Sequence, residues 1–534
     1  MKHFHIQTRR SFFSTMKKIG ATAALASLTD IPFVMKQALA SGSNLGTNGK
    51  KLLFIFLRGA NDSLNSVVPI MDDGYAPSRP TLNIKKDPAL DYTASGACDL
   101  SAMNTDPAAS TFSYTNGIRL GNGFAALHPS HKFLAPVYNA GDLALVHRVA
   151  YPRQSRSHFD SQNYWETGNP NNNISKDGIF YRTIIESGLA STNALTGVSI
   201  QSSLPLILRG SDAALTNLQD PTRYNLLGIP YQTGDAKADA FMKAANQFPF
   251  PDKMNRDLLS LQYKNMSDTL QIFASINFSE AGNTFVDDAP IDGEAAPYNL
   301  FPTTNAKNGG WAMHGNNPNK YVVPPGSYGF FTNLKNAAIV LNKTDAIIAG
   351  TGLDGFDTHN NQGALTGQHP NLQRTIAWAM YGLRKYFMNN ADKATWDNLV
   401  VVTLSEFGRT TIENSTLGTD HAEAGVMFIA GGAVKGYAAG RPAVFGCSPN
   451  DTIPWVTGQT SGTSSMFGAD SRYLKRAYDY RSVLGKLIRD HLGASQDQLN
   501  RIIPGYASAG ENLKAGGRSS KDGVNIIGEP DIIG

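Results

Sequence analysis

Acidic residues and histidines recur beside the apolar runs of this 534-residue chain, in five short segments. The segments read "RGANDSLN", "SRSHFDSQ", "GLDGFDTHNNQ", "SEFGRT" and "GTDHAEAG". Carboxylate oxygens and imidazole nitrogens are ligands of zinc, manganese, magnesium or calcium, according to the share of nitrogen among them. We therefore expect a divalent metal ion as cofactor. The candidate ligands are Asp62, Asp357, His359, Glu406, Asp420 and His421.

No single segment is specific, because aspartate also caps turns and helices. What the segments share is their position next to expected strands. Continuous apolar runs of this kind are typical of strands that are buried on both faces of a sheet. The runs cover 51–62, 142–149, 204–210, 345–352, 398–405 and 425–432.

Helical patterns fall between these runs, notably at 369–390 and 479–493. Strands that alternate with helices predict an α/β fold whose central sheet is mostly parallel and covered by helices on both faces. In such sheets, ligands gather at the carboxyl ends of the strands. The five segments are therefore expected to meet at one edge of the sheet and to share one polar site.

Residues 1–40 have the features of an export signal of the twin-arginine type. Arg9 and Arg10 precede an apolar stretch, and "ALA" at 38–40 supplies the small residues of a cleavage site. The apolar stretch is shorter than the ~20 residues that span a bilayer. The expected location is the periplasm or the exterior, with no transmembrane anchor after cleavage.

The expected signal also holds most of the positive charge. It contains six basic residues and one acidic residue, whereas the whole chain has a net charge of +4. The mature chain is left with about −1, which argues against nucleic acid or an anionic membrane surface as a partner. The only two cysteines, Cys98 and Cys447, would reach an oxidising compartment, where a disulfide between them is an open alternative.

Composition divides the mature chain further. Residues 41–505 are expected to form the α/β domain, and Gly/Asn/Pro-rich sequence between about 230 and 330 indicates an inserted lobe. Residues 506–534 are rich in glycine, serine and lysine, and we expect a loosely ordered tail there.

Several long motifs carry a resemblance to a known family. They include "FLRGANDSLNSVVP", "QSRSHFDSQNYWETG", "GFDTHNNQ" and "LSEFGRTTIENSTLGTDHAEAGVMFIAGGAVKG". On these motifs the chain is similar, from Lys51 to about residue 495, to the twin-arginine-exported domain-of-unknown-function 1501 family. That family is grouped with the alkaline phosphatase and sulfatase superfamily. The resemblance implies an alkaline-phosphatase-like three-layer fold with metal ligands at strand ends.

The pattern of that superfamily is incomplete in this sequence. Asp62 and Asp357 match aspartates that bind metal in the superfamily, and His421 corresponds to its last metal histidine. Asn361 and Phe407, however, stand where the pattern has histidines. A two-metal site is therefore not present residue for residue, which leaves a single or rearranged site.

The superfamily places its nucleophile at a helix N-terminus, about ten residues before a Thr-Gly or similar pair. The corresponding stretch here is "SRSHFDSQNYWETG" at 155–168, and free N–H groups at a helix start stabilise an attacking anion. Three interpretations stay open: Ser157 is the nucleophile, His158 is a ligand or nucleophile, or Ser157 only caps a helix. Arg156 and Arg409 are candidate substrate-binding residues, because guanidinium groups pair with phosphate or sulfate oxygens.

The leading hypothesis is an exported, metal-dependent, hydrolase-like protein that acts on phosphate or sulfate esters, with Ser157 and His158 as the candidate catalytic residues. The substrate would be a small molecule or a polymer that carries such an ester. The alternative is a non-catalytic binding or assembly protein of the cell envelope that retains the fold. An exported protein partner would suit that alternative.

Overall fold

The computed structural model describes residues 43–99, 115–191, 193–211, 215–221, 267–278, 285–287, 298–303, 323–448 and 472–534. The expected signal at 1–40 and most of the expected lobe at 230–330 lie outside the described residues. Within the described ranges, no helix has both the length and the apolar character needed to cross a bilayer.

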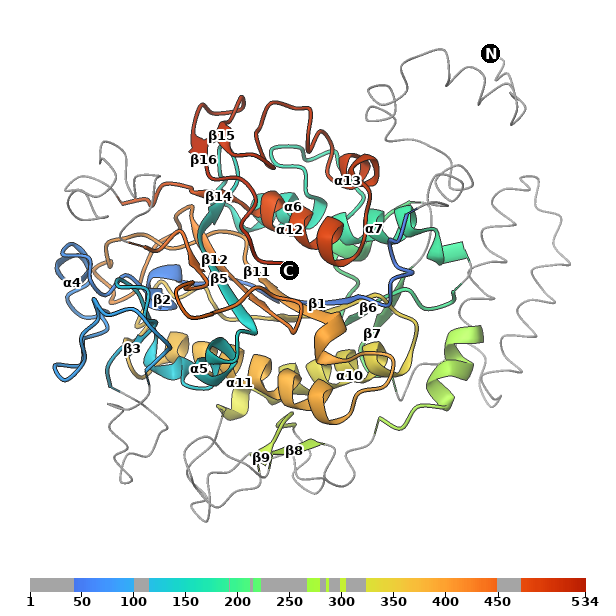
Figure 1. The fold of residues 1–534 in the computed structure, drawn as a ribbon, viewed down its shortest axis with the longest axis horizontal. Helices are drawn as coiled ribbons and strands as arrows, with labels where there is room; N and C mark the ends of the chain where they lie inside the picture. Colours follow the sequence, from blue (N-terminus) through green and yellow to red (C-terminus); the bar gives the residue numbers. More distant parts are fainter. Residues whose placement is uncertain are drawn as a thin grey trace, which may run out of the picture.

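A nine-stranded sheet forms the centre of the part of the chain that the structure describes (Figure 1). The strands follow the order β13–β5–β12–β11–β1–β10–β6–β7, and β14 pairs with β5 as well. Their bounds are β1 Lys51–Leu57, β5 Leu143–Ala150, β6 Gly197–Ile200, β7 Thr216–Leu218, β10 Ile348–Leu353, β11 Leu399–Leu404, β12 Gly425–Ala430, β13 Val444–Phe445 and β14 Tyr478–Asp479.

Strand β1 lies in the interior of the sheet, between β10 and β11, and runs parallel to both. All of its residues are buried, as expected for a strand that is covered on both faces. Opposite Phe54 stands Gly350, where a Cβ atom would come within 2.3 Å of the Phe54 ring. Glycine at this position lets the aromatic ring lie across the neighbouring strand.

Strand β12 corrects the predicted topology. It runs antiparallel to β11 and β5, whereas the other pairings in the sheet are parallel. The sheet is therefore mixed, and the expectation of a mostly parallel sheet is wrong. The cause of the error is that β12 is buried throughout, and an apolar run that is buried on both faces carries no sign of its direction.

The run at 204–210 is also not a strand. It contains the short 3-10 helix Leu206–Leu208, and β6 and β7 form this side of the sheet instead. The helix predicted at 369–390 is confirmed as α11, Gln368–Asn389. Its buried apolar residues recur every three or four positions, as in Ile376, Met380, Leu383 and Phe387.

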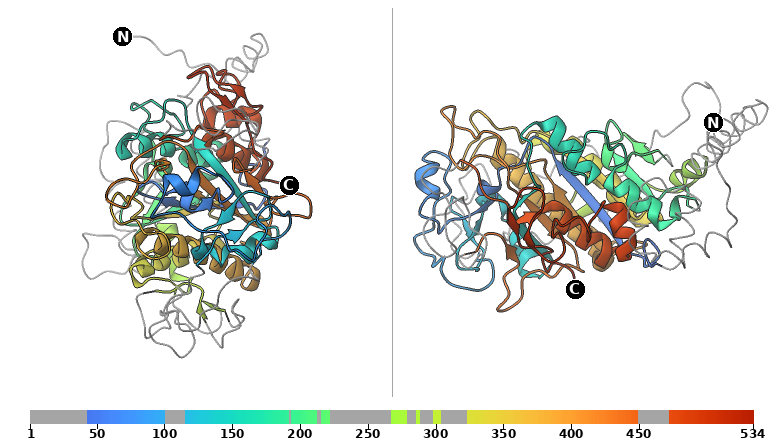
Figure 2. Two further views of the ribbon diagram at one scale, coloured as in Figure 1. Left: turned by 90° about the vertical axis from the view of Figure 1, so that its left-hand side faces the viewer. Right: turned by 90° about the horizontal axis from the view of Figure 1, so that it is seen from above.

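Helices cover both faces of the sheet, in agreement with a three-layer α/β arrangement (Figure 1 and Figure 2). One face carries α5 Leu134–Asn139, α10 Tyr328–Lys343 and α11. The other face carries α6 His158–Thr167, α7 Ile179–Ser187, α12 Tyr480–Lys486 and α13 Gln496–Ile502.

Smaller elements flank this core. A three-stranded sheet has the order β2–β4–β3. Cys98 and Cys447 are both buried, and no disulfide joins them. The bounds are β2 Val67–Val68, α4 Tyr75–Ser78, β3 Ile118–Arg119, β4 Ala126–Leu127, β8 Val286–Asp287, β9 Tyr298–Asn299, β15 Gly517–Arg518 and β16 Asn525–Ile526.

Residues 506–534 pack onto the domain, so the expectation of a loosely ordered tail is wrong. The Tyr506 hydroxyl donates to Glu529 Oε1 at 2.6 Å, and Arg489 pairs with the same oxygen at 2.6 Å. Ile532 is fully buried. The segment contains few such anchoring residues among many glycines, serines and lysines. Its average composition therefore gave the wrong prediction of loose order.

A fully buried ion pair holds the loop after β1. Asp62 Oδ2 accepts hydrogen bonds from Arg79 Nη1 at 2.6 Å and from Gln362 Nε2 at 2.6 Å. Burial raises the pKa of Asp62, but the charges of Arg79 and His369 and the hydrogen bonds from Arg79 and Gln362 together outweigh it, so the net shift is downward and the carboxylate stays ionised. Arg79 also donates to the carbonyls of Thr410 and Thr411. The pair thus ties the loop after β1 to the connection between β11 and β12.

Replacing Asp62 by asparagine should destabilise the fold, because the charge of Arg79 would stay buried without its counter-charge. We expect a loss of about 3–5 kcal/mol in the free energy of unfolding, measured by urea titration of the purified protein. The matched control is Asp99→Asn, which removes the part-exposed partner of Arg119 and should cost about 1 kcal/mol or less. Equal losses in the two variants would contradict this role of the buried pair.

Candidate functional site

Three connections meet at one edge of the sheet. His158 begins α6, which follows β5, while Asp357 and His359 follow β10 and His421 precedes β12. Because β12 is antiparallel to β5 and β11, the residues before it lie at the same edge as the residues that follow those strands. The corrected direction of β12 is therefore what brings His421 to this edge.

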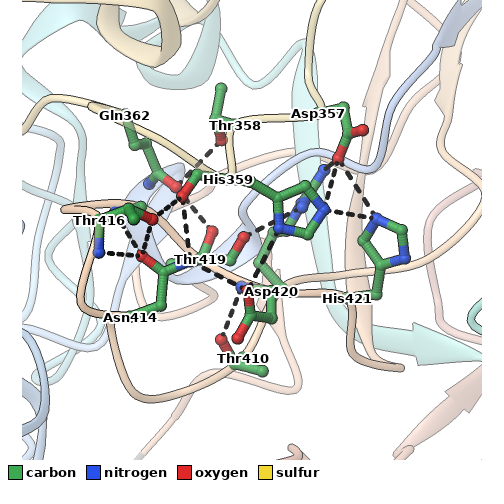
Figure 3. Close-up of polar contacts among 12 residues, drawn as sticks. Asp357, Thr358, His359, Gln362, Thr410, Asn414, Thr416, Thr419, Asp420 and His421 are labelled. Atoms are coloured by element: carbon green, nitrogen blue, oxygen red, sulfur yellow. Dashed lines mark hydrogen bonds and ion pairs between the residues drawn. The ribbon is translucent and has the colours of Figure 1, made fainter.

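Four side chains turn their ligand atoms towards one another. His421 Nε2 lies 3.0 Å from His158 Nε2 and 2.9 Å from His359 Nε2. Asp357 Oδ1 lies 3.2 Å from His359 Nε2 and 3.3 Å from His421 Nε2, and Figure 3 shows both rings beside this carboxylate. Asp357 Oδ2 lies 3.5 Å from His158 Nε2. We call His158, Asp357, His359 and His421 the histidine cluster.

Each imidazole of the cluster is held through its other nitrogen by an oxygen atom. The contacts are His158 Nδ1 to Glu406 Oε1 at 2.9 Å, His359 Nδ1 to Asp420 Oδ1 at 3.2 Å, and His421 Nδ1 to the Arg156 carbonyl at 2.8 Å. Carboxylate and carbonyl oxygens only accept hydrogen bonds, so each Nδ1 carries the proton, and the Nε2 of a neutral imidazole is then a lone pair. The ligand atoms of His158, Asp357 and His421 all lie within 4.8 Å of one another, which is an arrangement that a cation stabilises, and His359 Nε2 contacts two of the three.

Glu406, one of the expected ligands, lies behind the cluster rather than in it. Its side chain is fully buried, and Oε1 accepts from Gly59 N at 2.8 Å and Gln162 Nε2 at 2.9 Å as well as from His158. Burial raises the pKa of Glu406, but the hydrogen bonds from His158, Gln162 and backbone N–H groups together outweigh it, and the net shift is downward. The ionised carboxylate in turn raises the pKa of His158. Glu406 thus orients His158.

Asp420 has the same relation to His359. It also accepts from Asn414 Nδ2 at 2.9 Å and pairs with Arg472 at 2.8 Å. The hydrogen bond from Asn414 is the main reason that the pKa of Asp420 is lowered. Figure 3 shows this carboxylate on the side of the His359 ring away from Asp357.

Arg409, a candidate substrate-binding residue, is fully buried and is engaged by the protein itself. It donates to Asp357 Oδ1 at 2.5 Å, to Ala60 O at 2.9 Å and to Phe356 O and Thr419 O at 3.1 Å each. Burial raises the pKa of Asp357, while the hydrogen bond and charge of Arg409 lower it to about 2. The structure thus makes Arg409 a positioning residue for Asp357 and leaves it no exposed surface for a substrate.

Arg156 remains accessible at the rim of the cluster. Its guanidinium carbon lies 3.7 Å from the centroid of the Tyr473 ring, and it pairs with Glu423 at 2.9 Å. The side chain is 40% exposed. Since its own carbonyl holds His421, Arg156 is fixed close to the cluster and stays a candidate for contact with an anionic group.

The stretch at 155–168 combines two of its three interpretations. Ser157 is the N-cap of α6, and its hydroxyl accepts from Asp160 N at 3.4 Å. His158, the first residue of the helix, contributes its imidazole to the histidine cluster. A cap at Ser157 and a ligand at His158 are therefore compatible, and a nucleophilic Ser157 stays a prediction.

Asp62 is not brought into the histidine cluster. The contacts of its carboxylate are with Arg79, Gln362 and the Leu64 N–H. The structure therefore gives Asp62 a role in holding the loop after β1, although the superfamily pattern implies a ligand there.

Three further side chains near the cluster were not among the predicted site residues, and they differ in how easily a sequence pattern could have identified them. Gln162 follows His158 by four positions on α6, so a search for side chains on the same helix face would find it. The Phe407 ring lies 4.8 Å from the rings of both His158 and His421, centroid to centroid, so it packs against the cluster that it cannot ligate. Arg472 lies 52 positions after Asp420 in sequence, and no local pattern marks it.

Residues 337–450 match the model of a family that is described as "Protein of unknown function (DUF1501)". This segment includes Asp357, His359, Glu406 and His421, whereas His158 lies outside it. No curated protein and no solved structure matches the chain. The family match is shorter than the range of the motifs quoted above, and it supports the DUF1501 family for this chain.

Proposed function

We propose that this chain is an exported, metal-dependent, hydrolase-like protein that acts on phosphate or sulfate esters. One observation carries the proposal: the Nε2 atoms of His158 and His421 and a carboxylate oxygen of Asp357 lie within 4.8 Å of one another, with His359 Nε2 next to His421 and Asp357. When all three imidazoles are neutral, hydrogen bonds among these atoms do not satisfy the arrangement, because the Nδ1 atoms already hold the protons. A divalent cation would be stabilised by His158, Asp357 and His421, with His359 beside them.

The donor set fits zinc better than the other candidate ions. Zinc takes histidine nitrogen and aspartate oxygen in four-coordinate sites, whereas magnesium and calcium prefer oxygen ligands. Ligating histidines typically donate their second N–H to a carboxylate or a backbone carbonyl. Glu406, Asp420 and the Arg156 carbonyl provide these acceptors.

The histidine cluster is open to solvent. The exposed fraction of the side chain is 25% for His158 and His421, 37% for His359 and 46% for Asp357. Structural zinc sites are closed by their ligands, whereas catalytic sites keep a position that water or substrate can reach. The exposure therefore favours a reaction over a purely structural role of the cation.

A bound divalent cation supplies Lewis acidity towards an ester oxygen. Arg409 and Glu406 hold Asp357 and His158 in place, and Arg156 offers a guanidinium to a phosphate or sulfate oxygen at the rim. We infer one cation rather than two, because Asp62 is engaged by Arg79. The choice of esters rests on the resemblance to the alkaline phosphatase and sulfatase superfamily.

Export by the twin-arginine pathway to the periplasm or the exterior is part of the proposal. Its support is in the sequence: the arginine pair, the short apolar stretch and the small residues at 38–40 occur in the required order.

A non-catalytic binding or assembly protein of the cell envelope is the second candidate. Three residues that were expected to contribute to the functional site have structural contacts instead, which favours this candidate. Ser157 caps α6, and Asp62 and Arg409 are buried in ion pairs. A cation would then organise a surface for a partner rather than a reaction.

Purified mature protein should contain about one zinc ion per chain, measured by plasma mass spectrometry. His421→Ala removes the imidazole that contacts the other three members of the cluster, and we expect it to lower the zinc content about tenfold or more. Glu406→Gln removes the carboxylate behind His158 and should weaken zinc affinity by about 10–100-fold. Ser157→Ala is the matched control: it changes the neighbouring helix cap and should leave the zinc content unchanged. Folded wild-type protein without bound metal would refute the metal site.

The zinc-loaded protein should hydrolyse at least one member of a panel of aryl, sugar and nucleotide esters of phosphate and sulfate. His421→Ala should lower kcat/KM by about a hundredfold or more, because the Lewis acid is lost. The control is Asp345→Asn, which removes the exposed partner of Lys393 and should leave the rate unchanged. No turnover in zinc-loaded protein, or equal turnover in the His421→Ala variant, would favour the binding or assembly protein.

A further inference from the structure

A cleft of about 930 Å³ lies beside the histidine cluster, and the chemistry proposed above gives it no role. Its walls come from α6, the loop at 201–209, the first turns of α10 and the end of β10. The volume falls within the range of small-molecule sites in proteins.

Gln162 connects this cleft to the cluster. Its amide oxygen accepts from Arg58 Nη1 at 3.0 Å, and its amide nitrogen donates to Glu406 Oε1 at 2.9 Å. Glu406 in turn orients His158. A ligand in contact with Gln162 is thus two hydrogen bonds away from a cluster imidazole.

Neutral polar side chains dominate the lining of the cleft. Amide and hydroxyl groups both donate and accept hydrogen bonds, and pockets for apolar ligands are instead lined mainly by hydrophobic side chains. The lining therefore favours a ligand with many hydroxyl groups. The amides and hydroxyls come from Asn163, Gln201, Ser203, Gln219, Thr332 and Asn333.

The charged residues of the cleft do not select an anion. Arg58 is paired with Glu166 at 3.3 Å. The other two charged residues of the lining, Arg209 and Asp354, are of opposite sign. With the two arginines balanced by two carboxylates, the cleft suits a ligand whose main body is neutral.

Phe159 adds an apolar plane to this polar lining. It follows His158 on α6, lines the cleft, and its side chain is 89% exposed. A sugar ring presents C–H groups on a face and hydroxyl groups around its edge. An exposed aromatic ring next to amide donors and acceptors complements both features.

We propose that the cleft binds an oligosaccharide, with Phe159 stacked on a sugar ring and the surrounding amides hydrogen-bonded to its hydroxyl groups. The bound sugar brings an ester substituent to the histidine cluster. This last clause rests on the function proposed above, whereas the binding of the sugar does not.

The test uses the mature chain as purified, an array of neutral and sulfated oligosaccharides, and calorimetric titration with the tightest-binding one. Phe159→Ala removes the stacking plane, and Gly329→Trp fills the cleft from a position where an added Cβ meets no atom within 4 Å. Each substitution should weaken binding about tenfold or more. Ile174→Ala, the matched control, removes another exposed apolar side chain (84% exposed) outside the lining, and should leave the affinity unchanged.

His421→Ala separates this proposal from the proposed hydrolysis. It disrupts the cluster but leaves the lining of the cleft intact, so the oligosaccharide should still bind even if turnover is lost. The proposal is overturned if no oligosaccharide binds saturably at millimolar concentration, or if Phe159→Ala and Gly329→Trp both leave binding unchanged. It is also overturned if only His421→Ala abolishes binding.

Discussion

The buried guanidinium of Arg409 donates hydrogen bonds to three connections of the chain that are distant in sequence. These connections follow β1, follow β10 and precede β12. A buried charge is costly to leave unpaired, so the three connections depend on one another for their geometry. Gly59 shows how closely they approach: its φ is 106°, and a Cβ atom there would lie 2.5 Å from Asp357 N. The acceptors are the carbonyls of Gly59, Ala60, Phe356 and Thr419 and the carboxylate of Asp357.

The positions of the histidines follow from this arrangement. Because β12 is antiparallel, its preceding connection returns to the edge where β5 and β10 end, and His421 arrives beside the carboxylate that Arg409 holds. His158 is aligned by a buried carboxylate and His359 by a part-exposed one, so each ring is oriented by the protein itself. Such a site is organised before a ligand binds, and binding then costs little further ordering of the chain.

Much of the layered fold and part of the cluster could be predicted from the sequence, since apolar runs mark buried strands and polar residues cluster at their ends. Asp357, His359 and His421 lie together as expected from that logic. The direction of β12 was not predictable, because burial on both faces removes the alternation that reports orientation. Residue type also could not distinguish a metal ligand from a residue that orients a ligand. Glu406 contacts His158 from the side away from the cluster, and its hydrogen bonds with Gly59 and Gln162 reveal this position.

Two aspartate–arginine pairs show why one aspartate is available to a ligand and the other is not. Arg79 contacts both oxygens of Asp62, through Nη1 at 2.6 Å and Nη2 at 3.1 Å, and the carboxylate is fully buried. Such bidentate pairs use the planar fork of arginine fully. Arg409 contacts only Oδ1 of Asp357, whose side chain is 46% exposed and whose Oδ2 faces His158. An arginine therefore occupies both oxygens of Asp62 but only one oxygen of Asp357. The second oxygen of Asp357 stays available to a ligand.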